Sequence, residues 1–179
     1  AERWVAQHDR IDAAIEPFGA LAIERAELAA GERVIDVGCG CGTTTLSLAR
    51  RVGPGGRALG VDISAVMLAR ARERASSAGL ANVEFANADA QTHAFAPDAW
   101  DCIYSRFGVM FFAEPARAFA NLRSALRRGG RVSFACWRPF PENPWMMVPF
   151  AALATFLTPP PPPPPGAPGP FSFGDPDRV

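Results

Sequence analysis

Apolar side chains near the start of the chain recur every three to four residues, as they do on one face of an amphipathic helix. The positions on this face are Trp4, His8, Ile11 and Ile15. Because a proline interrupts helical hydrogen bonding, we expect this helix to end near Pro17. A second helical stretch is expected over residues 19–29. Residues 1–30 are therefore predicted to form an N-terminal helical cap.

From residue 31 onward, short apolar runs alternate with longer amphipathic stretches. The expected strands are residues 33–37, 57–61, 82–86, 100–104 and 131–136. The expected helices are 43–52 with Thr43 as N-cap, 65–77 with Ser64 as N-cap, and one opened by Glu114 and Pro115. This alternation predicts an α/β fold, namely a Rossmann-like, doubly wound, mostly parallel sheet with helices on both faces. We assign this core to residues 31–136 and expect ligands at the carboxyl ends of its strands.

After residue 136 prolines and aromatic residues replace the alternation. We expect a short helix over residues 150–157, polyproline II structure over the prolines 159–165, and a helix starting at Asp175-Pro176. Residues 137–179 are interpreted as an insertion or lid with the proline run as a surface loop; a docking segment for a proline-recognising domain is the alternative. The aromatic residues indicate either a site for a flat or apolar acceptor or a satellite core. They are Phe107, Phe111, Phe112, Trp137, Phe140, Trp145 and Phe150.

The charge balance argues against strongly charged partners. Arg and Lys together number 18, as do Asp and Glu, so we expect neither nucleic acid nor a membrane as partner. No apolar run approaches the ~20 residues of a bilayer span. The four cysteines lack the spacing of a disulfide framework or a metal site, so no metal is expected and a cytoplasmic location is favoured. The oligomeric state stays open.

The strongest candidate for chemistry is the turn from Asp36 to Gly42, of sequence DVGCGCG, between the first strand and its helix. Its alternate glycines permit positive φ and let a ligand approach the backbone, and the helix start adds free N–H groups. In dinucleotide dehydrogenases the spacing is G-x-G-x-x-G and the ligand is a pyrophosphate. Here the third glycine comes one residue sooner, and Asp36 precedes Gly38 by two residues. A carboxylate there suits a ligand bearing an ammonium and a sulfonium, which favours S-adenosylmethionine over NAD. A purely structural turn is the alternative.

Two further carboxylates follow the next two strands. Asp62 lies 22 residues after Gly40, and an acidic residue at about this distance typically accepts both ribose hydroxyls. It serves NAD and S-adenosylmethionine equally, so it indicates a nucleoside without choosing one. Asp89 can accept from an adenine amino group, and Ala90 adds a backbone N–H. The alternatives are a structural helix-entry carboxylate at Asp62 and an ordinary polar loop at Asp89.

Together these motifs resemble those of the class I S-adenosylmethionine-dependent methyltransferases, over residues 32–136. The resemblance implies a first motif at 34–42, a ribose-binding motif at 60–64, an adenine motif at 87–90, a segment under the methionine moiety at 105–108, and a turn into the fifth strand at 126–131. The implied cofactor contacts are Asp36, Gly38, Cys39, Gly40, Asp62, Ile63, Met67, Asp89, Ala90, Ser105 and Arg106. The branch that the chain resembles most is the small-molecule one with the ubiquinone/menaquinone biosynthesis enzymes. In that branch a leading helix covers the cofactor, and Arg3-Trp4 and Asp9-Arg10 look similar to it.

The resemblance also implies a sheet of seven strands, whereas the pattern predicts five. We therefore expect the C-terminal strands to be missing from this chain, because a naturally reduced domain would expose strand and core.

The resemblance implies methyl transfer from S-adenosylmethionine to a small-molecule acceptor by in-line displacement. Holding two reactants in line supplies much of the rate, and a base is needed only if the acceptor must lose a proton. His8 and His93 are the two histidines, and we assign neither a catalytic role. Tyr104 is expected in the core. The alternatives are an NAD(P)-dependent oxidoreductase and a catalytically idle S-adenosylmethionine-binding module.

Overall fold

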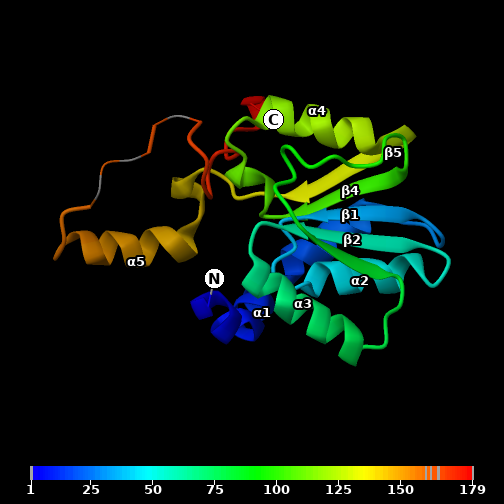
Figure 1. Cartoon of the computed structure of the whole chain (residues 1–179). Coiled ribbons are helices and arrows are strands. Elements are labelled where there is room, and N and C mark those ends of the chain that lie inside the picture. The colour runs from blue at the N-terminus through cyan, green and yellow to red at the C-terminus, as the bar shows by residue number, and fades with distance from the viewer. Residues whose placement is uncertain (1, 160, 162, 165, 179) are drawn as a thin grey trace. The chain divides into compact units, whose positions relative to one another are not determined.

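A computed structural model describes residues 2–159, 161, 163–164 and 166–178 (Figure 1). The chain divides into two compact units. The first comprises Ala1–Val109 with Glu114–Ala135, and the second comprises Met110–Ala113 with Cys136–Val179.

The first unit is built on one five-stranded sheet in the order β3-β2-β1-β4-β5. Its strands are β1 (Arg33–Val37), β2 (Arg57–Asp62), β3 (Val83–Asn87), β4 (Trp100–Arg106) and β5 (Leu126–Ala135). All four neighbouring pairs run parallel, as predicted. Sequence order reverses direction at β1, so the carboxyl ends of β1 and β4 flank the switch point where such sheets bind ligands.

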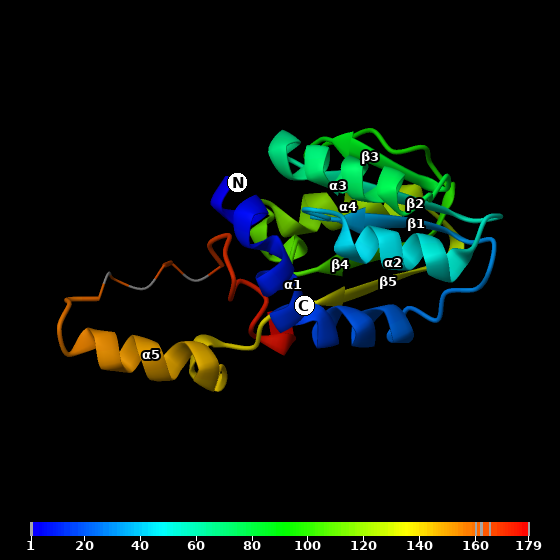
Figure 2. The same cartoon turned by 90° about the horizontal axis from the view of Figure 1, so that it is seen from below.

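Helices cover both faces of this sheet, which confirms the predicted fold class. They are α1 (Glu2–Arg25), α2 (Thr43–Val52), α3 (Ala65–Ser77) and α4 (Pro115–Ala125). Figures 1 and 2 show α1, α2 and α3 on one face and α4 on the other. Strands buried on both faces consist of continuous apolar runs. Accordingly Val34, Ile35 and Ile103 have no exposed surface, and neither does Tyr104, the predicted core tyrosine.

The N-terminal prediction of two helices was wrong. A single helix, α1, runs through Pro17, and the chain leaves it only after Arg25. Proline within a helix costs about 3 kcal/mol, so other contacts must offset it. Gly19 and Ala22 are buried, and the hydroxyl of Tyr104 donates to the Gly19 carbonyl at 3.0 Å. The packing of α1 on the sheet therefore overrides the local preference.

Several element boundaries also differ from the prediction. Thr43 is the first residue of α2, and its N-cap is Gly42 in the left-handed conformation. Strand β4 extends to Arg106, and β5 starts at Leu126, directly after α4. The predicted cap was correct at Ser64, whose hydroxyl accepts from the Met67 amide at 3.4 Å.

The second unit contains the helix α5 (Pro144–Ala154) and a 3-10 turn at Phe140–Glu142. The helix begins earlier than predicted because Pro144 occupies its first turn, where a proline is tolerated. The helix expected at Asp175-Pro176 is a 3-10 turn, Pro176–Arg178. Three prolines of the predicted polyproline II segment, Pro160, Pro162 and Pro165, lie outside the described residues.

Aromatic side chains of the second unit pack on one another. The ring centroids of Trp137 and Trp145 are 5.1 Å apart, and those of Phe140 lie 5.2 Å from Phe150 and 5.4 Å from Phe171. Trp145 and Phe150 nevertheless stay 59% and 42% exposed, so this packing does not decide between a satellite core and an acceptor site. Across the described part of the chain, no helix is both long and apolar enough for a membrane span.

Candidate active site

The glycine turn after β1 is held against the loop after β4. Gly38 has a φ of 72°, and a Cβ built on it would lie 2.7 Å from the Cα of Gly108. No side chain fits between two backbones at that distance. Glycine is therefore required at position 38 by the close contact with the backbone of Gly108.

Ser105 joins the same two loops with its hydroxyl group. Its Oγ donates to the Val37 carbonyl at 2.8 Å and accepts from the amides of Gly108 (3.1 Å) and Val109 (3.2 Å). Ser105 is fully buried. The Ser105 hydroxyl therefore fixes the end of β1 to the loop after β4. Because Ser105 is buried, this hydroxyl lies beneath the surface of that loop.

Asp62 ties the glycine turn to the end of β2. Its Oδ2 accepts from the Gly40 amide and its Oδ1 from the Ser64 amide, both at 2.8 Å. A Cβ on Gly40 would lie 2.8 Å from the terminal methyl of Met67. Three predicted site residues, from the first motif, the ribose-binding motif and the helix that follows it, therefore meet at one point. Ile63, beside them, is 78% exposed.

Asp36 lies beneath this turn with no exposed surface. Its Oδ2 accepts from the hydroxyls of Thr44 (2.7 Å) and Thr45 (2.6 Å) in the first turn of α2. Its Oδ1 is buried without a hydrogen-bond partner among the residues that the structure describes. Burial raises the pKa of Asp36 to about 6, against the opposing effect of the two threonine hydroxyls. The charged form would thus gain from a nearby cation.

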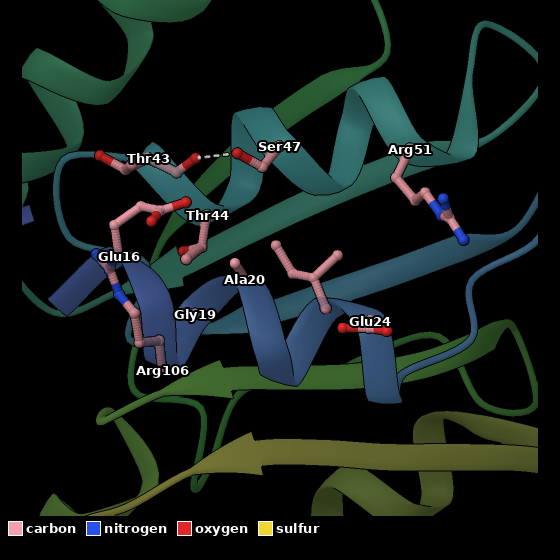
Figure 3. A pocket seen from close by; sticks show the side chains of 10 residues that line it. Glu16, Gly19, Ala20, Glu24, Thr43, Thr44, Ser47, Arg51 and Arg106 are labelled. Atoms are coloured by element: carbon pink, nitrogen blue, oxygen red, sulfur yellow. Dashed lines mark hydrogen bonds between the residues drawn. The ribbon is translucent and has the colours of Figure 1, made fainter. Parts of the chain in front are cut away.

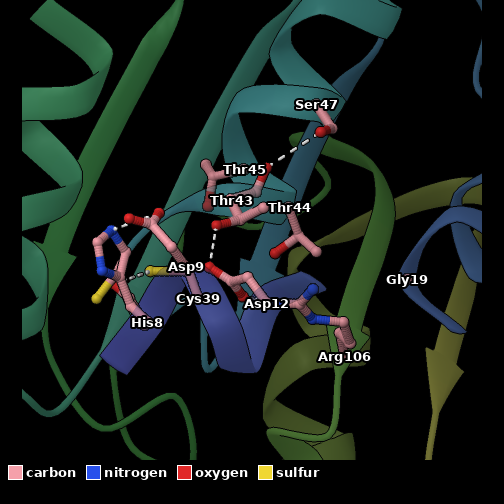
Figure 4. Close-up of polar contacts among 12 residues, drawn as sticks. His8, Asp9, Asp12, Gly19, Cys39, Thr43, Thr44, Thr45, Ser47 and Arg106 are labelled. Carbon is pink, nitrogen blue, oxygen red and sulfur yellow. Dashed lines mark hydrogen bonds and ion pairs between the residues drawn. The ribbon is translucent and has the colours of Figure 1, made fainter. Parts of the chain in front are cut away.

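A charged cluster around Asp12 was missed in the sequence. The Asp12 carboxylate of α1 accepts from Arg106 Nη2 at 2.5 Å and from the Thr43 hydroxyl at the start of α2 (Figure 4). Arg74 of α3 donates to the same hydroxyl at 2.7 Å and to the Cys41 carbonyl at 2.8 Å. We call these four residues, Asp12, Thr43, Arg74 and Arg106, the Asp12 clamp. It fastens α1 across the glycine turn and engages the predicted site residue Arg106.

Asp89 and Ala90 follow β3, which is linked to the end of β2. The side-chain amide of Asn87 donates to the Asp62 carbonyl at 3.0 Å. Asp89 is exposed, and its carboxylate accepts from the backbone and side chain of Gln91. Ala90 is buried. The structure brings Asp89 to the same edge of the sheet as Asp62 but shows no direct contact between their side chains.

The cysteines of the turn are poorly suited to metal binding. Burial raises the pKa values of the Cys39 and Cys41 thiols, which disfavours the thiolate that a metal requires. Within the described ranges, no three His, Cys, Asp or Glu side chains gather as a metal site would need.

A cavity of about 350 Å³ separates α1 from α2 beside the clamp (Figure 3). Gly19 and Ala20 make room for it on α1, while Thr43 and Arg106 line the end nearest the glycine turn. This volume is at the small end of the range for ligand sites.

The fold and the turn define a Rossmann-like α/β domain with a glycine-rich turn after its first strand and carboxylates after the next two strands. A family model described as "Methyltransferase domain" matches residues 34–130, more than half of the chain. The chain belongs to this methyltransferase domain family. The match gives no support to the oxidoreductase alternative.

Individual relatives agree with this assignment. Aklanonic acid methyltransferase DauC of Streptomyces sp. (strain C5) is 34% identical over 118 residues, covering 66% of this chain and 54% of the relative. The ubiquinone/menaquinone biosynthesis C-methyltransferase UbiE of Methylococcus capsulatus is 36% identical, covering 63% and 46%. The crystal structure of a SAM dependent methyltransferase from Aquifex aeolicus shares the fold, with a TM-score of 0.64, 21% identity and 77% coverage of each chain. The chain spans about half the length of the two curated relatives.

Proposed function

We propose that this chain binds S-adenosylmethionine and transfers its methyl group to a small, apolar acceptor. The observation that carries the proposal is the bond from the Gly40 amide to the Asp62 carboxylate, which unites the glycine turn with the predicted ribose site. Each carboxylate oxygen of Asp62 accepts one backbone N–H, so each retains acceptor capacity for a hydroxyl group.

Buried Asp36 supports a cationic ligand. Its Oδ1 has no hydrogen-bond partner among the described residues, and its pKa is raised, so a neighbouring ammonium or sulfonium would stabilise the carboxylate. We therefore assign the methionine end of the cofactor to Asp36, Gly38, Cys39 and Arg106. Ser105 takes part by holding the loops.

The nucleoside end is assigned to the next two strands. Asp62 would hold the ribose, the exposed side chain of Ile63 and the methyl of Met67 would flank it, and Asp89 with Ala90 would receive the adenine. When bound, S-adenosylmethionine supplies an electrophilic methyl group on its sulfonium. The residues of this chain bind and orient the reactants, and proximity accounts for much of the rate.

A general base is not part of the proposal. His8 is 6% exposed, and its Nδ1 lies 2.9 Å from the Val5 carbonyl oxygen. The ring of His93 packs on Phe95 with centroids 4.7 Å apart. The acceptor class is proposed from the names of DauC and UbiE, which act on aklanonic acid and in quinone biosynthesis. A cytoplasmic location is proposed from the four free thiols.

Native mass spectrometry tests the cofactor, and turnover tests the reaction. We expect S-adenosylmethionine or its demethylated product to co-purify, whereas NAD in its place would contradict the proposal. Methylation of a quinol or phenol in a panel that also contains amines is expected. Cofactor binding without turnover across the panel would favour the idle binding module.

Asp62→Ala tests the ribose assignment. Loss of charge-assisted hydrogen bonds should weaken cofactor affinity about tenfold or more in calorimetry. Asp98→Asn is the charge control, because Asp98 is exposed and lies just before the amino end of β4, at the opposite edge of the sheet, so cofactor affinity should stay unchanged. An Asp62→Ala variant that melts as the parent does and binds equally well would refute the assignment.

A further inference from the structure

A second groove, of about 430 Å³, lies between α2 and α3. Arginine and hydroxyl side chains dominate its lining, which is Thr43, Leu46, Ser47, Arg50, Arg70, Arg74, Ser77 and Ala78. No carboxylate is among these residues. The chain has equal numbers of acidic and basic residues, so the excess of positive charge around this groove is local.

The lining follows from two matched helical stripes. On α2 the polar positions are Thr43, Ser47 and Arg50, and on α3 they are Arg70, Arg74 and Ser77. Both sets are spaced by four and then three residues, so each occupies one face of its helix. Figure 2 shows α2 and α3 on the same side of the sheet.

The guanidinium groups are only partly neutralised. Arg50 is exposed and makes no hydrogen bond or ion pair within the described part of the chain. Arg70 pairs at 3.2 Å with Glu73, whose side chain is 67% exposed, so solvent screens that interaction. Arg74 lies 3.9 Å from Asp12 and uses Nη1 for its hydrogen bonds. A guanidinium has five N–H donors, so donors remain available on all three arginines.

Gathering three cations around one groove costs repulsion, which an anion would relieve. A guanidinium fork matches the geometry of two phosphate oxygens, and arginine is the residue that favours such bidentate contacts. A single carboxylate would neutralise one arginine, whereas a ligand with two or more charges could engage several.

We propose that the groove between α2 and α3 binds the phosphate or pyrophosphate group of a small molecule, through Arg50, Arg70 and Arg74. Neither Asp62 nor Asp89 lines this groove, whereas Arg74 also belongs to the Asp12 clamp. This assignment stands whether or not the chain transfers methyl groups.

Calorimetry with inorganic pyrophosphate at low ionic strength tests the site. Sodium chloride at the same ionic strength is the control titrant. We expect binding in the parent protein. Arg50→Gln should weaken it about tenfold, the effect of one charge-assisted contact, and Arg50→Lys should retain part of the affinity. Pyrophosphate should also raise the melting temperature of the parent, and at equal concentration it should raise that of Arg50→Gln less.

Arg123→Gln is the matched control, because Arg123 is exposed near the end of α4 and its loss changes the net charge equally. Its affinity for pyrophosphate should change less than about twofold. Equal losses of pyrophosphate affinity in Arg50→Gln and Arg123→Gln would overturn the proposal, since they would show that binding depends only on the net charge of the protein. No binding by the parent would also overturn it. Binding of phosphatidylglycerol vesicles or of an oligonucleotide without binding of pyrophosphate would refute the small-molecule assignment.

Discussion

Replacing Gly38 by alanine isolates the contact between the two loops of the site. The new Cβ would lie 2.7 Å from the Cα of Gly108, so the loops must separate. The left-handed φ of 72° adds about 1–2 kcal/mol for a residue with a side chain. Overpacking against backbone typically adds about 1–3 kcal/mol. We expect Gly38→Ala to lower the free energy of unfolding by about 3 kcal/mol in urea denaturation, and to weaken cofactor binding.

Gly79→Ala is the control for strain alone. Gly79 has a φ of 63°, but nothing lies within 4 Å of a Cβ built on it. Its replacement should therefore cost about 1–2 kcal/mol and leave cofactor affinity unchanged. Equal losses of stability in the two variants would refute the reasoning, because the clash would then contribute nothing.

Three further outcomes are expected. Since the native pKa of Asp36 is raised from 3.8 to about 6, stability should fall as pH rises through this window, by up to about 3 kcal/mol. Urea denaturation from about pH 4 to about pH 8 should show that Asp36→Asn lacks this component; identical pH profiles would contradict it. Asp12→Asn should lower the unfolding free energy by about 2 kcal/mol, because its carboxylate is only 16% exposed and is held by Arg106. The control Asp98→Asn, at an exposed loop position, should lower it by under about 0.5 kcal/mol, and comparable effects of the two variants would exclude the clamp. Tyr104→Phe should cost about 1 kcal/mol in thermal denaturation by leaving the Gly19 carbonyl without its donor, and no change would indicate that this bond is weak.

The parallel core was predictable because its signals are local. Strands of five to ten residues are separated by helices everywhere except between β3 and β4, and this alternation indicates both the direction of the strands and the edge where ligands bind. The meeting of Gly40 with Asp62 could be expected from the same rule. The end of α1 could not, because local sequence reports the cost of Pro17 but not the packing that offsets it.

The Asp12 clamp shows a second limit of sequence reasoning. Asp12 and Arg106 are 94 positions apart in the sequence. The local sequence of an amphipathic helix does not indicate which distant residue a polar side chain will contact. Likewise, glycines in a turn indicate close approach without stating what approaches. At Gly38 the neighbour is Gly108, and the roles that the sequence suggests for individual cofactor contacts remain predictions.

The hydroxyl of Ser105 has a thermodynamic consequence for any ligand that binds at the carboxyl ends of β1 and β4. It holds three backbone groups of two loops at once, so those loops are already ordered before a ligand arrives. Little conformational entropy is then lost on association, and more of the contact energy appears as affinity. A ligand that binds between the glycine turn and the loop after β4 should therefore meet a preformed site, and its association rate should not depend on loop closure.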